Sequence, residues 1–167
     1  MTNNVFVTVG STRFDRFIAA ISSPPFLAQL LSLGYTHLTV QHGQSPIPNS
    51  FSSLTHDLGL HLDAYTYKSS LRDDMERASL IVSHAGSGSI LEALRLNKNL
   101  IVVVNEDLMD NHQQELGSAL HEQGHLVCCS VSGLENALRE KKYESLVPYP
   151  EPDPTRFANF LNTRMGV

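Results

Sequence analysis

A regular alternation between short apolar runs and helical spacing of apolar side chains is the feature that most constrains the fold of this chain. Residues 5–9 and 100–104 are rich in β-branched side chains, which is typical of strands buried on both faces of a sheet. Apolar residues at helical spacing follow each of these two runs. Strands that alternate with helices in this way predict an α/β fold, with a Rossmann-like parallel sheet and helices on both of its faces.

The same two patterns place the remaining elements. Further strands are expected at residues 36–41, 60–64, 80–83 and 126–129, and helices at residues 14–21, 26–33, 69–78, 89–96, 110–123 and 134–140. Pro24 and Pro25 separate the first two helices, and Gly34 is the expected C-terminal cap of the second. The segment 42–57 is rich in Gly, Ser, Pro and Asn and is expected to be a loop.

The length of the chain and its prolines predict one globular domain followed by a tail. With 167 residues the chain is long enough to bury one core, which we assign to residues 1–147. Residues 148–154 carry a proline at every second position and are expected to form an extended spacer. Apolar residues at helical spacing then predict a helix over residues 155–167. This helix is too short to be stable alone in water, so it must dock onto this domain or onto another chain.

Composition narrows the function and the location. A net charge of −5 argues against a nucleic-acid-binding surface. No stretch reaches the roughly 20 apolar residues of a membrane span, and the chain does not open with a signal-peptide pattern. Cys128 and Cys129 are adjacent in an expected strand, so they point to opposite faces and fit buried thiols of a reducing compartment. We therefore expect a cytoplasmic domain.

The most informative motif is a glycine turn between an expected strand and the helix that follows it, Ser83-His84-Ala85-Gly86-Ser87-Gly88-Ser89. A junction of this kind leaves backbone N–H groups unpaired at the positive end of the helix dipole. Phosphate binds readily at such a helix end, and glycine lets the backbone approach it closely. The pattern predicts a phosphate site, and the alternative is a tight turn that binds nothing.

Three classes of phosphate ligand can be compared with this motif. A P-loop for a nucleoside triphosphate is disfavoured, because the segment contains no lysine. A dinucleotide would need an acid about 20 residues further on, where Glu106 stands, but Leu91 replaces the third glycine. A nucleotide-sugar diphosphate would place its phosphates on the turn and its ribose on Glu92, about one helical turn beyond Ser89.

A polar cluster follows the expected strand at residues 100–104, namely Asn105-Glu106-Asp107-Leu108-Met109-Asp110-Asn111-His112-Gln113-Gln114-Glu115. Side-chain amides both donate and accept hydrogen bonds, which suits the hydroxyl groups of a sugar. Ligands of open α/β sheets bind beyond the carboxyl ends of the strands. The cluster, the glycine turn and the N-terminal turn Gly10-Ser11-Thr12 are therefore expected to share one edge. The alternative for the cluster is a solvated helix start with Asp110 as its N-cap.

Two further motifs do not carry chemistry. His121-Glu122-Gln123-Gly124-His125 has the HExxH spacing of a zinc protease, but Gly124 is expected to end the helix and leave two exposed histidines. Ser87 and Ser89 do not fit a nucleophile elbow, because the flanking glycines of that motif are missing. We therefore expect no metal site and no serine nucleophile.

Together these residues resemble a known family. The similar segments are Val5-Phe6-Val7-Thr8-Val9-Gly10-Ser11-Thr12-x-Phe14-Asp15, the glycine turn with Glu92, Asn105-Glu106-x-Leu108-Met109-x-Asn111-His112-Gln113-x-Glu115-Leu116, and His121-x-x-Gly124-His125-Leu126. They resemble the catalytic subunit of the two-chain UDP-N-acetylglucosamine transferase of dolichol-linked oligosaccharide (N-glycan precursor) synthesis. A weaker resemblance extends to the C-terminal half of the bacterial lipid II glycosyltransferase. The likeness covers nearly the whole chain.

This resemblance implies half of a GT-B glycosyltransferase, a Rossmann-like domain that binds the donor. A membrane-anchored partner subunit would bind the acceptor and recruit the chain to the cytosolic face of the endoplasmic reticulum, with the tail helix as a candidate docking element. The implied reaction transfers GlcNAc from UDP-GlcNAc, with inversion, to GlcNAc-diphospho-dolichol and gives chitobiosyl-diphospho-dolichol. It implies no cofactor and no metal.

The resemblance also implies site residues. Those expected to bind the donor are Gly10, Ser11, Thr12, His84, Ala85, Gly86, Ser87, Gly88, Ser89, Glu92, Asn105, Asn111, His112, Gln113, Gln114 and Glu115. The glycine turn would hold the diphosphate, Glu92 the ribose and the polar cluster the GlcNAc hydroxyls, while the N-terminal turn would close over the phosphates. No general base is identified. The candidates are His84, which either touches the diphosphate or packs beneath the turn, and Asp15, which also fits a first-turn helix acid.

Three other functions stay open at this point. The chain could be a subunit that binds a UDP-sugar without catalysing transfer, a Rossmann oxidoreductase that uses NAD(P), or a protein-interaction module. Ligand preference distinguishes them, because the first binds UDP-sugars, the second binds NAD(P) and the third binds neither.

Overall fold

The computed structural model describes residues 3–108, 111–152, 155 and 162, and it gives no side chain for Asn111. Their strands are β1 (Asn4–Thr8), β2 (His37–Gln41), β3 (His61–Tyr65), β4 (Leu80–His84), β5 (Asn99–Val104) and β6 (Val127–Ser130). Their helices are α1 (Asp15–Ile21), α2 (Pro24–Ser32), α3 (Phe51–Leu58), α4 (Arg72–Arg77), α5 (Ser87–Arg95), α6 (Asn111–Glu122) and α7 (Leu134–Glu140), with a 3-10 helix η1 (Lys142–Ser145).

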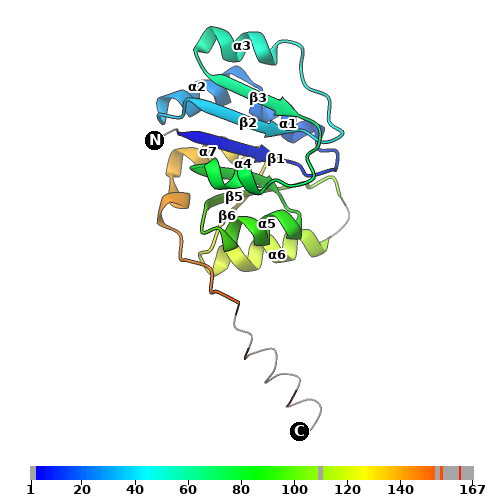
Figure 1. Ribbon diagram of the computed structural model, residues 1–167, viewed down its shortest axis with the longest axis vertical. Helices are drawn as coiled ribbons and strands as arrows, with labels where there is room; N and C mark the ends of the chain where they lie inside the picture. The colour runs from blue at the N-terminus through cyan, green and yellow to red at the C-terminus, as the bar shows by residue number, and fades with distance from the viewer. Residues whose placement is uncertain (1–2, 109–110, 153–154, 156–161, 163–167) are drawn as a thin grey trace.

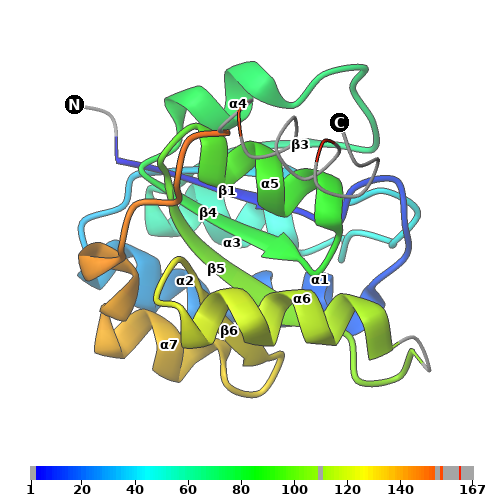
Figure 2. The same cartoon turned by 90° about the horizontal axis from the view of Figure 1, so that it is seen from below.

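The strands form one parallel sheet in the order β3-β2-β1-β4-β5-β6. Helices cover both faces, as the sequence predicts. In Figure 1, α4 and α5 lie in front of the sheet and α1, α2 and α7 lie behind it. Figure 2 shows the strands between these two layers.

Each face of the sheet has its own apolar core. Val5 and Val7 of β1 pack with α1, α2 and α7, whereas Phe6 between them packs with α4, α5 and α6. Alternate side chains of a strand point to opposite faces, so a strand that is covered on both sides needs an unbroken apolar run. Cys128 and Cys129 follow this rule, because they pack with opposite cores, although both are only half-buried and not fully buried.

The strand order reverses between β1 and β4. Each of these two strands pairs with the other and leads away to a different side of the sheet. In open α/β sheets a ligand binds at such a reversal, outside the carboxyl ends of the strands. We call the loops that follow β1, β4 and β5 at this edge the rim; in Figure 1 it lies on the right, where the arrowheads point.

The prediction of a loop over residues 42–57 is wrong for its second half, where α3 forms. Phe51 and Thr55 are buried on one face of this helix, and Gly59 ends it with φ +74°. Its sequence is rich in serine, which favours caps and turns over helix interiors. Packing of Phe51 into the core outweighs that preference.

Other elements keep their predicted type with shifted ends. Helix α4 begins at Arg72 and not at residue 69, whereas α5 begins two residues early, with Ser87 and Gly88 in its first turn. Pro24 and Pro25 stand at the start of α2, where the missing proline N–H costs nothing.

After η1 the described chain runs without regular structure to residue 152, as expected for the spacer. The predicted tail helix over residues 155–167 lies almost wholly outside the described residues. No helix in the described part of the chain has both the length and the apolar character needed to cross a bilayer.

Candidate functional site

The glycine turn lies at the carboxyl end of β4 and leads directly into α5. Gly86 is the N-cap of this helix, and no side chain caps it. The N–H of Ile90 donates to the Gly86 carbonyl over 3.0 Å and closes the first turn. The N–H groups of Ser87, Gly88 and Ser89 have no hydrogen-bond partner among the described residues. Three amides and the positive end of the helix dipole are therefore available to an anion at the rim.

A groove of about 380 Å³ runs along the face of α5 that carries Gly88 and Glu92. Arg72 of α4 and Arg95 of α5 also line it. A Cβ atom placed on Gly88 would have no described atom within 4 Å outside its own helix turn and chain neighbours. Glu92 is half-buried, and within the described part of the chain its carboxylate has neither an ion pair nor a hydrogen bond. The groove thus presents an acceptor one helical turn from the free amides.

The N-terminal turn lies beside the glycine turn, because β1 and β4 are neighbours. Its amides are already largely used. The N–H of Gly10 donates to Thr8 Oγ1 over 2.9 Å, and the N–H of Thr12 donates to the Val9 carbonyl over 3.3 Å. Only the amide of Ser11 has no partner among the described residues. This turn therefore has fewer free N–H groups for a ligand than the sequence suggested.

The loop after β2 holds this N-terminal turn, a contact that the sequence analysis missed. The N–H of Gln44 donates to the Thr12 carbonyl over 3.0 Å, and Ser45 Oγ accepts from the N–H of Phe14 over 2.6 Å. Gly43 has φ +54°, and a Cβ on it would overlap the Thr12 carbonyl oxygen. The glycine was visible in the sequence, but its packing partner was not.

His84 lies between the two glycine turns. A Cβ on Gly86 would stand 2.7 Å from its Cε1 atom, and a Cβ on Gly10 would stand 3.0 Å from the same atom. Its Nδ1 atom is buried without a hydrogen-bond partner among the described residues. Desolvation by burial lowers the pKa of His84. The ring is therefore neutral at pH 7.

The polar cluster after β5 forms the third part of the rim. Asn105 closes its own loop, because Oδ1 accepts from the N–H of Asp107 over 3.2 Å. Gln113 and Gln114 in the first turn of α6 are half-buried, and the described structure gives neither a hydrogen-bond partner. Both amides remain available to a ligand. The predicted N-cap Asp110 lies outside the described residues.

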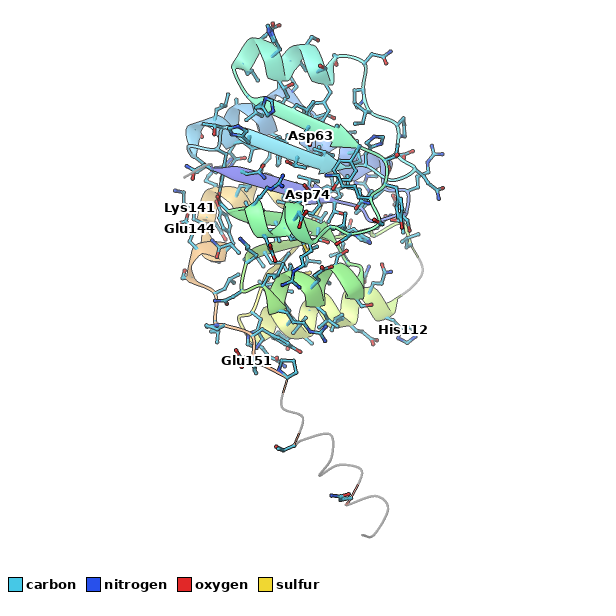
Figure 3. The ribbon with its side chains drawn as sticks, viewed as in Figure 1. Asp63, Asp74, His112, Lys141, Glu144 and Glu151 are labelled. Carbon is cyan, nitrogen blue, oxygen red and sulfur yellow. The ribbon has the colours of Figure 1, made fainter. Side chains whose placement is uncertain are left out.

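His112 and Glu115 of the same cluster face solvent. Figure 3 shows His112 projecting from the molecule on the side of the rim. Its Nδ1 lies 3.8 Å from Glu115 Oε2, and both side chains are largely exposed. The structure thus places them at the rim but outside the groove of Glu92.

Asp15 stands at the start of α1, just beyond the N-terminal turn. Arg13 donates to both of its carboxylate oxygens, at 2.8 and 3.1 Å. These hydrogen bonds with Arg13 lower the pKa of Asp15. A carboxylate with a lowered pKa is a weaker base, so the structure argues against Asp15 as the general base.

The prediction of two exposed histidines at the HExxH-like segment is wrong for His125. His121 is exposed, but His125 is 9% exposed, and its Nδ1 lies 2.9 Å from the Val147 carbonyl oxygen. Its ring also contacts Tyr149 edge-on at 5.3 Å between centroids. The described residues contain no group of three or more metal-binding side chains. His125 therefore anchors the start of the spacer.

Comparison with known proteins identifies the family. A profile described as the glycosyltransferase family 28 C-terminal domain matches residues 4–163. The human protein named UDP-N-acetylglucosamine transferase subunit ALG13 is 50% identical over 129 residues, which cover 75% of this chain and 11% of the human protein. The chain thus spans about a tenth of the length of the human and mouse relatives.

Solved structures show the same fold. A solution structure of ALG13 has a TM-score of 0.70 and 29% identity, and the match covers 96% of this chain and 95% of that one. Acinetobacter baumannii MurG has a TM-score of 0.64 and 19% identity, over 84% of this chain and 40% of MurG. At that identity the likeness to MurG is evidence of fold alone.

The six-stranded sheet, the free helix end at the strand-order reversal and the matched profile define the class: this chain belongs to the glycosyltransferase family 28 C-terminal domains, with the fold of one half of a GT-B enzyme. Within that family, its relatives above 30% identity bear the name UDP-N-acetylglucosamine transferase subunit ALG13. The resemblance drawn from the sequence motifs is thereby confirmed.

Proposed function

We propose that this chain binds UDP-GlcNAc at the rim and is the donor-binding subunit of a GlcNAc transferase. One observation carries the proposal: at the start of α5, three amides without a partner among the described residues lie one helical turn from Glu92, whose carboxylate has none there either. A nucleoside diphosphate needs both, since its phosphates accept hydrogen bonds and its ribose hydroxyls donate them. The names of the relatives support GlcNAc as the sugar.

The chemistry follows from the same groups. Transfer makes UDP the leaving group, and negative charge grows on its phosphate oxygens. The amides of Ser87, Gly88 and Ser89 and the helix dipole would stabilise this charge without a metal ion. Gln113 and Gln114 would orient the sugar through its hydroxyls, and an acceptor hydroxyl held in line behind the anomeric carbon would give inversion.

The proposal includes a partner, because the chain corresponds to only one half of a GT-B fold. A membrane-anchored subunit would bind GlcNAc-diphospho-dolichol on the cytosolic face of the endoplasmic reticulum and supply the general base. The word subunit in the relatives' names supports a complex.

Ligand-dependent thermal unfolding tests the donor site. UDP-GlcNAc and UDP should raise the melting temperature in a concentration-dependent way, because a ligand that binds only the native state stabilises it. NAD should have no effect. A rise in melting temperature with NAD alone would favour the oxidoreductase hypothesis. If none of these ligands changes the melting temperature, the protein-interaction module is the remaining hypothesis.

Two acidic residues separate the UDP-sugar and dinucleotide hypotheses. Glu92→Gln should weaken UDP binding by about 1–3 kcal/mol in isothermal titration, the usual cost of removing a hydrogen bond to a charged group. Glu106→Gln is the matched control, because Glu106 is exposed in the loop after β5. If UDP binding depends on Glu106 and not on Glu92, the assignment of the ribose to the groove is wrong.

Catalysis is tested with the partner present. The chain and the membrane subunit together should convert UDP-GlcNAc and GlcNAc-diphospho-dolichol to the chitobiosyl product. Donor binding without turnover in that reconstituted pair would identify a non-catalytic UDP-sugar-binding subunit instead.

A further inference from the structure

Positions 86 and 88 of the same turn are both glycine, but for different physical reasons. Gly88 is exposed, and a Cβ on it would meet nothing within 4 Å. Gly86 has φ −81° and ψ 125°, a conformation open to any residue, so its backbone does not require glycine. A Cβ on Gly86 would nevertheless collide with the ring of His84, at Nε2 and at Cε1. His84 is what excludes a side chain at position 86.

The same ring also restricts the turn after β1. A Cβ on Gly10 would stand 3.0 Å from Cε1 and 3.3 Å from Nε2 of His84. One imidazole therefore contacts the backbone of two loops that follow neighbouring strands, β1 and β4. These two strands flank the point where the strand order reverses.

We infer that His84 is a positioning residue that acts as a spacer between the two glycine turns. It fixes the distance between the N-terminal turn and the free amides of Ser87–Ser89 by filling the space between Gly10 and Gly86. Its role is carried out through these loops and not by contact with the diphosphate. This inference rests on the proposed function for its effect on UDP, but the packing itself does not depend on any ligand.

His84 as a whole is half-buried, and the enclosure of one ring nitrogen agrees with a spacer. Nδ1 is enclosed and has no partner among the described residues, so this nitrogen cannot reach a ligand at the rim. A neutral ring packed beside the two glycine turns needs no counter-charge, whereas a histidine that binds phosphate gains from being charged.

A double-mutant cycle on stability tests the packing. Gly86→Ala should lower the melting temperature by about 4–8 °C, because a methyl group is forced into an occupied space. In a His84→Ala background the same change should lower it by less than about 2 °C, since the obstacle is gone. Gly88→Ala is the matched control, and its effect should be equal in both backgrounds. An equal effect of Gly86→Ala in both backgrounds would overturn the inference.

Two measurements then separate a spacer from a phosphate ligand. His84→Ala should weaken UDP binding about tenfold, the loss expected when one amide hydrogen bond is misplaced. In the wild-type chain, the carbon and nitrogen NMR signals of the His84 ring should stay those of a neutral imidazole at pH 6.5 when UDP saturates the site. A ring that becomes protonated on UDP binding contacts the diphosphate, and that result would refute the spacer.

The two proposals fail separately. If UDP does not bind the wild-type chain, the proposed function is wrong, while the stability cycle still decides whether His84 separates the turns. If UDP binds but the cycle shows no coupling, the proposed function stands and the spacer is wrong.

Discussion

At the scale of single residues, Gly88 stands out because the fold gains nothing from it. It lies in the first turn of α5, where a glycine costs up to about 1 kcal/mol relative to alanine. In the part of the chain that the structure describes, no neighbour within 4 Å of its missing Cβ requires that space to be empty. A close approach of a ligand to the backbone is the physical reason left for this glycine.

Gly88→Ala should therefore change stability and binding in opposite directions. We expect a rise of about 1–3 °C in the melting temperature, from the better helix former, together with weaker UDP binding. Scanning calorimetry and titration with UDP measure the two effects. Ser118→Ala, at an exposed position of α6, is the control and should leave UDP binding unchanged. Unaltered UDP affinity in the Gly88 variant would show that the phosphates do not bind at this turn.

The neutral state of His84 makes stability depend on pH. Burial lowers its pKa in the folded chain, whereas the unfolded ring titrates near its ordinary value of about 6.5. Below that pH the unfolded chain takes up a proton that the folded ring resists, so the free energy of unfolding falls. Above about pH 6.5 the ring is neutral in both the folded and the unfolded chain, so the full contribution of His84 to the free energy of unfolding is present.

His84→Ala removes this dependence, although the cavity it leaves lowers stability at every pH. The difference in melting temperature between the wild-type chain and the variant should therefore be largest above pH 7 and shrink towards pH 5.5. Unfolding curves of both chains across that range test this. A difference that grows on acidification would mean that the folded ring is charged.

At the scale of elements, the loop after β2 acts as a support for the N-terminal turn. Gly43 has a left-handed backbone, and its missing Cβ leaves room for the carbonyl oxygens of Thr12 and Gly10. Gln44 adds a hydrogen bond from its N–H to Thr12. This support reaches the rim from a strand that contributes no proposed donor ligand of its own.

Gly43→Ala should lower both stability and UDP affinity. Gly59→Ala is a close control, because Gly59 has a similar φ of +74° but nothing within 4 Å of its missing Cβ. We expect about 1 kcal/mol of destabilisation at Gly59, from backbone strain alone, and about 3 kcal/mol or more at Gly43, where the methyl group also collides. Only the Gly43 variant should lose UDP affinity. Equal losses of stability would show that the loop can move aside.

The elements also show what the sequence can predict. Strands were predictable because burial on both faces demands apolar runs, as in β5. Helix α3 was missed because its serines favour turns, and only the packing of Phe51 shows that a helix forms. The glycine turn and Glu92 were predictable because they are close in sequence. The contacts of Gly43 and of His125 were not, because their partners come from distant segments.

At the scale of the whole molecule, the proposed donor site and the anchored spacer lie in different places. The rim and the adjoining groove on α5 carry every proposed donor contact. The segment after η1 crosses the amino ends of β5 and β6, where Val147 bonds to Gly124 and Tyr149 packs on His125. The described part of the spacer thus lies at the opposite end of the sheet from the rim.

Two truncations test this division. Removal of residues 153–167 should leave the melting temperature and UDP binding unchanged, and should abolish co-purification with the membrane subunit. Removal of residues 146–167 should in addition lower the melting temperature, because the contacts of Val147 and Tyr149 are lost. If the shorter deletion does not affect co-purification, the tail is not the docking element.

The anchoring of the spacer by His125 has a spatial consequence. A partner attached beyond this anchor would be joined to the chain at the amino ends of the strands, whereas the proposed donor site lies at their carboxyl ends. Attachment of the partner and binding of the donor would then depend on opposite ends of the sheet.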